Sequence, residues 1–503
     1  MRAMNSCCLT VILLLGGCST VPTLPNAKPA VADAIWDGEQ PALCLALSGG
    51  GIRSGAVSLG VLQGLHEQGL LQETDLVSTV SGGGYPVYGL IATAVKAPNS
   101  TLDSLLADGS KFITTSEDLP FISADDGVLA AFLGGAGVSV SVISTILGPT
   151  PDIVERATLS YLYALDIHET FVGYMAPNGD GISLAQSKSV GQGLAFPYWI
   201  IQTSASTGLR PPLNAHRYEF GDVFELSPDW IGSDTFGYMR SYISDLTLMD
   251  SVVASAAAID APRTNNDDFA VPDWAKRIGF GLGVGVSLQD GKQVFLSDGG
   301  FIENQTVIPL LRRSCKNILA LDASHDPDAK MRGWSNVAKY MHANGWQVSV
   351  PHFVKGTSPA DKPKDAWHLP SHLYALSGSK PDQTRVDILV MKLGIDQSEV
   401  GLYPAAVQDF WREQLGNGIK EPGCNGLKRL KNRCTFPQQA TVTQLFKPAE
   451  FRAYRCLGYH LVKDVVSRPS SGPLYRPDAV FSSIDCAAPP PAPDVPNPAD
   501  TLQ

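Results

Sequence analysis

The tetrapeptide Ser-Gly-Gly-Gly occurs twice, each time after a short apolar run and before a segment with helical spacing. The first copy lies in "CLALSGGGIRSG" (44–55) and the second in "STVSGGGYPVYGL" (78–90). Glycines between a strand and a helix can direct backbone N–H groups into open space at the positive end of the helix dipole, which suits an anion or a tetrahedral oxyanion. The glycines Gly49, Gly50 and Gly51, followed by Arg53, fit this role.

The first turn has two other interpretations. It can be an ordinary tight turn, or it can be a loop that binds a nucleotide or another anion. A dinucleotide loop is disfavoured, because Ser54 stands where a third glycine belongs and no suitable ribose-binding acid follows the second strand. A non-enzymatic lipoprotein that binds a nucleotide or another anion through Gly49–Gly51 nevertheless remains an alternative.

The second turn places a serine at its sharpest point. In a nucleophile elbow a serine stands between strand and helix, and small neighbours let the backbone adopt a strained turn. Ser81 has this setting, with Gly82, Gly83 and Gly84 behind it, although Thr79 stands where the usual Gly-x-Ser-x-Gly pattern has its first glycine. An ordinary glycine-rich turn is the alternative.

A serine nucleophile requires a general base. Asp298, in "VFLSDGGFIENQ", ends an apolar run and precedes two glycines, which predicts a place at the edge where α/β active sites assemble. A plain Asp-Gly turn explains the same letters. Among nine scattered histidines, His325 in "LDASHDP" is the best placed for a Ser-His-Asp triad. A Ser81–Asp298 dyad and a triad are both open.

Taken together, Gly-Gly-Gly-x-Arg, the elbow serine and Asp-Gly-Gly resemble the patatin-like phospholipases, including the related cytosolic phospholipase A2 lineage. The resemblance is close over 43–90 and 294–324 and thin between them. Two positions depart from the family pattern: Ser54 replaces the glycine that usually follows the arginine, and Thr79 replaces the first glycine of the elbow. These departures bear on the geometry of the two turns.

The resemblance implies a role for each motif. Ser81 would be acylated, Asp298 would be the only base, and Gly49–Gly51 would form the oxyanion hole beside Arg53. It further implies a lipid acyl hydrolase that cleaves carboxylic esters through an acyl-enzyme, uses neither metal nor cofactor, and acts on a phospholipid or another acyl-ester lipid at a membrane surface.

Strands and helices are expected to alternate around these motifs, which indicates an α/β fold. The resemblance implies the patatin-like three-layer form, a central and largely parallel sheet flanked by helices. The expected strands are 43–47, 76–80, 198–203, 294–296, 318–321 and 388–391. The expected helices are 54–68, 85–96, 248–259, 304–313, 405–415 and 448–466. Trp230 and Tyr238 are expected to serve packing rather than lipid contact.

The N-terminal segment predicts export. Residues 1–17 have the form of a signal peptide, and "LGGC", which ends at Cys18, resembles the lipobox of bacterial lipoproteins. We therefore expect lipidation at Cys18 and a Pro-rich tether over 18–40. The expected location is the bacterial cell envelope, anchored in a membrane and with the outer membrane favoured.

The rest of the chain predicts a catalytic domain over 41–325, a C-terminal extension packed on it over 326–486, and a disordered Pro-rich tail over 487–503. The 503 residues are 44% hydrophobic, enough for a sizeable core. The net charge of −11, with no Lys/Arg-rich stripe, argues against a nucleic-acid partner. The uncharged stretch 127–151 can be a buried or lid-like segment, an interfacial element or a membrane span.

Export also bears on the cysteines, because disulfides persist outside the cytoplasm. Cys44, in a core strand, and Cys315, after a helix, are expected to be reduced. The four cysteines near the C-terminus are expected to form the bridges Cys424–Cys434 and Cys456–Cys486, although four cysteines allow three connectivities.

Overall fold

The structure of the protein is a computed structural model that describes residues 35–36, 39–106, 164, 167–168, 170–172, 181–206, 221–243, 246–257, 283–287, 293–326, 331–348, 352–353, 373–395, 397–416, 436–439, 446, 448–481 and 486. Several sequence predictions lie outside these residues. They concern the signal peptide, Cys18, the uncharged stretch 127–151, the pair Cys424–Cys434 and the C-terminal tail.

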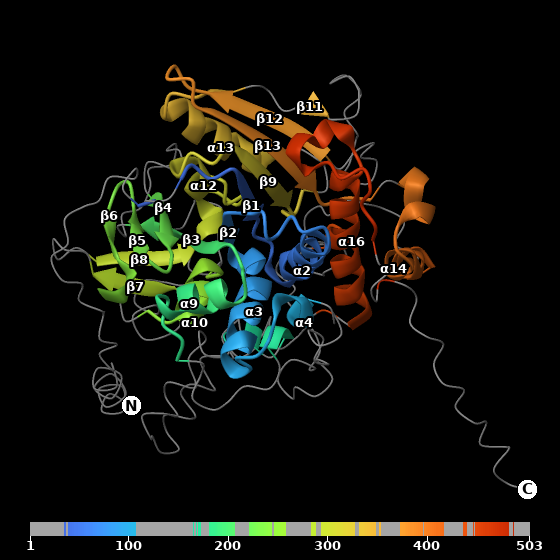
Figure 1. The fold of residues 1–503 in the computed structure, drawn as a ribbon, viewed down its shortest axis with the longest axis horizontal. Coiled ribbons are helices and arrows are strands. Elements are labelled where there is room, and N and C mark those ends of the chain that lie inside the picture. Colours follow the sequence, from blue (N-terminus) through green and yellow to red (C-terminus); the bar gives the residue numbers. More distant parts are fainter. Residues whose placement is uncertain are drawn as a thin grey trace, which may run out of the picture.

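A mixed β-sheet forms the centre of the molecule (Figure 1). Its strands are β1 (Leu43–Leu47), β2 (Leu76–Val80), β3 (Tyr198–Ser206), β4 (Gly221–Leu226), β5 (Trp230–Ser233), β6 (Gly237–Arg240), β7 (Val284–Ser287), β8 (Gln293–Asp298), β9 (Asn317–Asp322), β10 (Gln347–Val348), β11 (His352–Phe353), β12 (Leu373–Ser379) and β13 (Arg385–Lys392). The order is β10-β12-β13-β9-β1-β2-β3-β4-β5-β6, with β11 on β12 and with β8 on β3 and β7. The five strands from β13 to β3 are parallel, and the strands on either side are antiparallel.

Helices cover both faces of this sheet, which gives the three layers expected from the sequence. The described helices are α2 (Gly51–Glu67), α3 (Tyr85–Lys96), α4 (Leu102–Leu106), α9 (Gln186–Gly193), α10 (Leu248–Ser255), α12 (Ile308–Arg312), α13 (Arg332–Ala343), α14 (Ala405–Gly416) and α16 (Pro448–Val466), with 3₁₀ turns at Ser81–Gly84, Ser241–Ile243, Gly299–Phe301, Gln397–Leu402 and Pro469–Leu474. No helix within the described ranges is long and apolar enough to cross a membrane.

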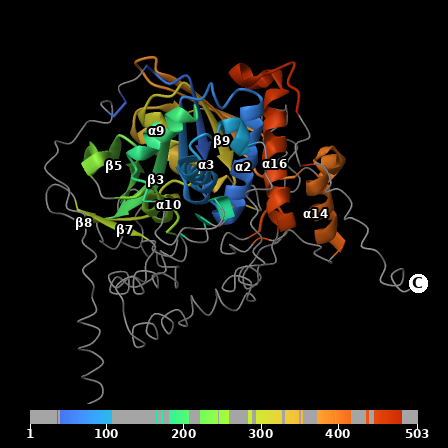
Figure 2. The ribbon, with the colours of Figure 1, turned by 60° about the horizontal axis from the view of Figure 1, so that its bottom comes forward.

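The alternation of side chains along the parallel strands explains why both faces need helices. In β1, Leu45 and Leu47 join the apolar cluster that includes α2, α3, α10 and α16, whereas Cys44 and Ala46 join the cluster of α12 and α13. A parallel strand buried on both faces in this way reads as a continuous apolar run. In Figures 1 and 2, α16 lies alongside α2, and α14 lies on the outer side of α16.

Most of the elements expected from the sequence are present with small changes in their ends. The helices 85–96 and 448–466 have the expected bounds, and the strand expected at 198–203 extends to 206. The helix expected at 304–313 is shortened to α12, because a 3₁₀ turn and a loop occupy the residues before it. Tyr238 is buried, and Trp230 packs under the Arg240 guanidinium, so both serve packing as predicted.

The prediction that Cys44 and Cys315 are reduced is wrong, because they form a disulfide. Their sequence separation is 271 residues, but Cys315 lies two residues before β9, which pairs directly with β1. This pairing brings the two Cα atoms to 6.4 Å, within the usual range for a disulfide. The predicted bridge Cys456–Cys486 is confirmed.

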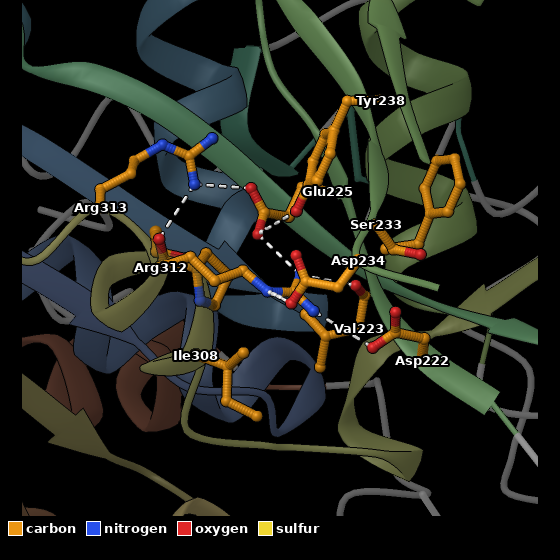
Figure 3. A network of polar contacts seen from close by, with 12 residues as sticks. Asp222, Val223, Glu225, Ser233, Asp234, Tyr238, Ile308, Arg312 and Arg313 are labelled. Atoms are coloured by element: carbon orange, nitrogen blue, oxygen red, sulfur yellow. Dashed lines mark hydrogen bonds and ion pairs between the residues drawn. The ribbon is translucent and has the colours of Figure 1, made fainter. Parts of the chain in front are cut away.

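A buried ionic network fastens α12 to β4 (Figure 3). Arg312 donates from Nη1 to Glu225 Oε1 at 2.8 Å and to the Val223 carbonyl at 2.9 Å, and Arg313 donates to Glu225 Oε2 at 2.6 Å. Arg312 also pairs with Asp222 and, through Nε, with Asp234. Since α12 follows the loop after Asp298, this network fixes the far end of that loop against the sheet.

Glu225 accepts from two buried guanidinium groups, and its side chain is 1% exposed. The Glu225→Gln substitution keeps the shape but leaves buried positive charge under-compensated, so we expect it to lower the free energy of unfolding by about 3–5 kcal/mol. Asp229→Asn, which breaks the partly exposed pair with Lys188, is the matched control and should cost less than about 1 kcal/mol. Urea unfolding of both variants measures the difference, and equal losses would contradict the role given to the network.

Candidate active site

Ser81 stands in a strained turn directly after β2. Its φ of 51° is in the left-handed region, which is uncommon for a residue other than glycine and marks a position held by its surroundings. The glycine behind it is required for close packing, since a Cβ on Gly82 would lie 1.9 Å from the Gly51 carbonyl oxygen. Ser81 therefore stands in a strained strand-to-helix turn of the kind that a nucleophile elbow requires.

The departure at Thr79 does not disturb this turn. Its hydroxyl accepts a hydrogen bond of 2.9 Å from the Trp199 indole N–H on β3. The threonine is thus used in packing between β2 and β3, on a strand whose five residues are all buried.

Asp298 lies beside Ser81, although the two residues are 217 positions apart. The Ser81 hydroxyl donates a hydrogen bond to the Asp298 carboxylate, and the Gly300 N–H donates to Asp298 Oδ1 at 2.7 Å. Burial raises the pKa of Asp298 from 3.8 to about 6, and these two hydrogen bonds oppose the rise. The carboxylate is therefore ionised at neutral pH yet basic enough to accept a proton.

Asp298 reaches the expected edge of the sheet for a reason that the sequence did not indicate. Its strand β8 is antiparallel to β3, so Asp298 is not at the carboxyl end of a parallel strand. Instead β3 continues beyond the end of β2, and β8 runs back along this overhang until Asp298 pairs with Thr203. Since the preceding residue, Gln202, pairs with Val80, Asp298 arrives level with Ser81.

The first glycine turn packs against the elbow. A Cβ on Gly49 would lie 3.2 Å from Ser81 Cβ, so the loop and the serine side chain are direct neighbours. Gly50 and Gly51 have φ values of 152° and 59°, which favour glycine. The N–H of Gly49 is used in a bond of 3.1 Å to the Asn304 carbonyl. Within the described part of the chain, the N–H groups of Gly50 and Gly51 have no acceptor.

Arg53 stabilises this loop through hydrogen bonds of its buried guanidinium. The side chain is buried, and its guanidinium donates to the Ala323 carbonyl at 2.8 Å and to the Gln439 carbonyl. Burial lowers the pKa of Arg53 from its usual value. Arg53 therefore ties the start of α2 to the end of β9 and to the segment 436–439.

The serine that follows Arg53 has a defined function in the loop. The Ser54 hydroxyl donates to the Ser48 carbonyl, and Ser48 Oγ accepts from the Ala323 N–H at 2.8 Å. These two bonds close the loop across its base, and a glycine at 54 could not make the first of them.

Three further side chains at this site had no role assigned from the sequence. Asn304 contacts both polar groups of the Gly49 main chain. The main-chain carbonyl of Asn304 accepts from the Gly49 N–H, and its side-chain Nδ2 donates to the Gly49 carbonyl at 3.4 Å. Ser255 and Gln202 contact the elbow and the loop after Asp298. Asn304 lies in the motif that contains Asp298, but nothing in the letters around Ser255 or Gln202 indicates a site.

His325 follows β9 and is half-buried. Among the described residues, the Ser81 hydroxyl bonds to Asp298 and to no histidine. No group of three or more His, Cys, Asp or Glu side chains in the described ranges is arranged to hold a metal ion.

Comparison with known proteins extends these observations. Residues 45–117 match the model of the family described as patatin-like phospholipase. Among curated proteins none matches the chain. Human GIVD cytosolic phospholipase A2 is a similar solved structure, with a TM-score of 0.49 and 15% identity over 84% of this chain and 61% of that chain. Its complex with methyl gamma-linolenyl fluorophosphonate inhibitor and terbium chloride gives 0.49 and 16%, over 84% and 58%.

The chain thus covers less than two thirds of the length of these solved structures. The family match includes both Ser-Gly-Gly-Gly turns and ends before Asp298. The segment that contains the glycine loop and the elbow serine therefore matches the patatin-like phospholipase family.

Proposed function

We propose that this protein is a lipid acyl hydrolase that cleaves carboxylic esters through a Ser81–Asp298 dyad. One observation carries the proposal: Ser81 has a left-handed φ at the elbow, and its hydroxyl donates a hydrogen bond to the buried Asp298 carboxylate. The glycine loop packs against the same serine, with the Gly50 and Gly51 N–H groups unpaired within the described part of the chain. Nucleophile, base and oxyanion donors are thus adjacent.

The first half of the reaction forms an acyl-enzyme. The Ser81 oxygen attacks the carbonyl carbon of the ester, while Asp298 takes the hydroxyl proton. The carbonyl oxygen becomes an oxyanion, which accepts hydrogen bonds from the N–H groups of Gly50 and Gly51 at the start of α2. The C–O bond of the ester then breaks, and the leaving alcohol takes the proton from Asp298.

The second half returns the enzyme to its starting state. A water molecule gives a proton to Asp298 and attacks the acyl carbon, and the same loop binds the second oxyanion. The bond between Ser81 and the acyl group breaks, the proton returns to the Ser81 oxygen, and the fatty acid leaves. A single carboxylate therefore serves as base and acid in both halves.

We further propose that the substrate is a phospholipid or another acyl-ester lipid and that the protein is a lipoprotein of the bacterial cell envelope, anchored through Cys18. Two features support this setting. The signal-like segment ends in a lipobox-like sequence, and the described part of the chain contains the disulfides Cys44–Cys315 and Cys456–Cys486, which form and persist in oxidising compartments. Fatty-acid release from a panel of phospholipids and p-nitrophenyl esters tests the substrate class directly.

The dyad makes a specific prediction about mutants. Ser81→Ala and Asp298→Asn should each lower kcat by at least about 10³-fold, because each removes a group that takes part in bond making or proton transfer. Since the two residues act as one unit, the double variant should be hardly slower than either single variant. Fatty-acid release and labelling by a fluorophosphonate measure both expectations.

His325→Gln is the matched control, since no imidazole lies on the proposed proton path. We expect this variant to keep a rate near that of the wild type. A folded Asp298→Asn protein with a near-normal rate would contradict the dyad. A loss in His325→Gln as large as that in Ser81→Ala would favour a triad instead.

The raised pKa of Asp298 determines how activity depends on pH. The base must be ionised, and burial moves its pKa from 3.8 up to about 6, so activity is gained as pH rises through about 6 and lost below it. At pH 5 we expect kcat/KM on an uncharged ester to be about tenfold below its plateau. Activity that stays at the plateau down to the usual carboxyl range would show that the base is not a buried carboxylate.

Membrane attachment depends on a different residue. Cys18→Ala should abolish incorporation of radiolabelled fatty acid into the protein and leave it as unprocessed precursor or release it from the membrane fraction. Cys424→Ala is the control, because it removes another cysteine outside the signal-like segment. Normal processing and undiminished membrane binding of the Cys18→Ala protein would refute the lipoprotein assignment.

A further inference from the structure

We propose that Ser255 and Gln202 form a brace that sets the position of Ser81 relative to Asp298, and that Ser255 is a positioning residue for the hydrolytic reaction. The proposal rests on the function proposed above. Its starting point is a contact at the nucleophile itself: the Ser81 N–H donates to Ser255 Oγ at 2.8 Å. Ser255 is the last residue of α10, and its side chain is buried.

The Ser255 hydroxyl is a bridge with a fixed polarity. It donates its own proton to the Gln202 carbonyl at 2.6 Å, so an oxygen lone pair must face the Ser81 N–H. The parallel pairing of β2 with β3 ends at Val80 and Gln202, immediately before the elbow. The hydroxyl therefore connects the two strands at the point where Ser81 leaves the ladder.

Gln202 extends this connection to the base. Its side-chain Nε2 donates to the carbonyls of Gly299, at 3.4 Å, and Glu303, both in the loop that follows Asp298. Since both partners are acceptors, the orientation of the amide is fixed by its surroundings. The next residue of β3, Thr203, pairs with Asp298 itself. Gln202 thus connects to Ser81 through its main-chain carbonyl, by way of the Ser255 hydroxyl, and to the loop after Asp298 through its side chain.

The brace matters because Ser81 is in an unfavourable conformation. A non-glycine residue at positive φ persists only where its surroundings enforce it. Without the Ser255 hydroxyl, the buried Ser81 N–H loses its acceptor, and the Val80–Ser81 peptide is free to rotate toward another partner. Such a rotation moves Ser81 Oγ away from Asp298 and from the glycine loop, while the substrate-binding surface stays unchanged.

Substitution of Ser255 tests this role against a matched control on the same helix. Ser251 is also buried on α10, but among the described residues its hydroxyl bonds to the Thr247 carbonyl one turn earlier and not to the elbow. We expect Ser255→Ala to lower kcat about 10–100-fold with KM within about twofold, since a misplacement near 1 Å can cost about 10²-fold in rate. Ser251→Ala should leave both constants near wild type at a similar melting temperature.

Two further variants separate positioning from a general loss of stability. Ser255→Thr keeps the hydroxyl and should recover most of the lost rate, whereas Ser255→Cys is close in shape but a weak donor and should remain slow. The rate of labelling of Ser81 by a fluorophosphonate should follow the same order, because it depends on the same nucleophile geometry.

The outcomes distinguish this proposal from the function on which it rests. If the wild type neither hydrolyses esters nor reacts with the fluorophosphonate, the proposed function fails. If the wild type is active and Ser255→Ala keeps its kcat, the brace is refuted and the dyad stands. An equal loss of kcat in Ser255→Ala and Ser251→Ala, or a Ser255→Cys rate equal to that of Ser255→Thr, also refutes the brace.

Discussion

The site depends on one constraint: a carboxylate must be buried against a serine hydroxyl and still ionise near neutral pH. Burial alone would favour the protonated acid, which cannot act as a base. Two hydrogen bonds, from the Gly300 N–H and the Ser81 hydroxyl, stabilise the charged form of Asp298 and hold its pKa at about 6. In the proposed reaction the serine is therefore both the proton donor and part of the environment that sets the proton affinity of Asp298.

Four buried cations of the described structure have partners away from Asp298, so none of them lowers its pKa further. Arg312 and Arg313 are engaged by Glu225, Lys392 lies 3.1 Å from Asp322, and Arg53 donates to two main-chain carbonyls. A guanidinium next to Asp298 would stabilise its anionic form and lower its pKa, making it a weaker base. Hydrogen bonds from neutral donors stabilise the anion less, so the carboxylate keeps the affinity for a proton that the first step of the proposed reaction requires.

The sequence was sufficient to predict the features that depend on local pattern. The apolar runs and the glycine turns located β1, β2 and the elbow, and the Asp-Gly-Gly motif located the residue that contacts Ser81. What it could not predict depends on pairing between distant strands. The disulfide of Cys44 with Cys315 follows from the β1–β9 ladder, and the position of Asp298 follows from an antiparallel strand on the overhang of β3. Ser255 reaches Ser81 only because α10 ends beside the same strand, and a serine at the end of a short helix carries no sign of that.

The two Ser-Gly-Gly-Gly segments have the same sequence, but their glycines have different functions in the two turns. In the first, Gly50 and Gly51 themselves take positive φ values, and the turn leaves two N–H groups without an acceptor in the described part of the chain. In the second, Ser81 takes the positive φ, and Gly82 allows the elbow to approach the Gly51 carbonyl of the first turn. The contact is reciprocal, since Gly49 leaves the room that Ser81 Cβ needs. The repeat is therefore best understood as one interface: the glycines carry no side chains where the two turns meet, and the Ser81 side chain lies there between Gly49 and Asp298.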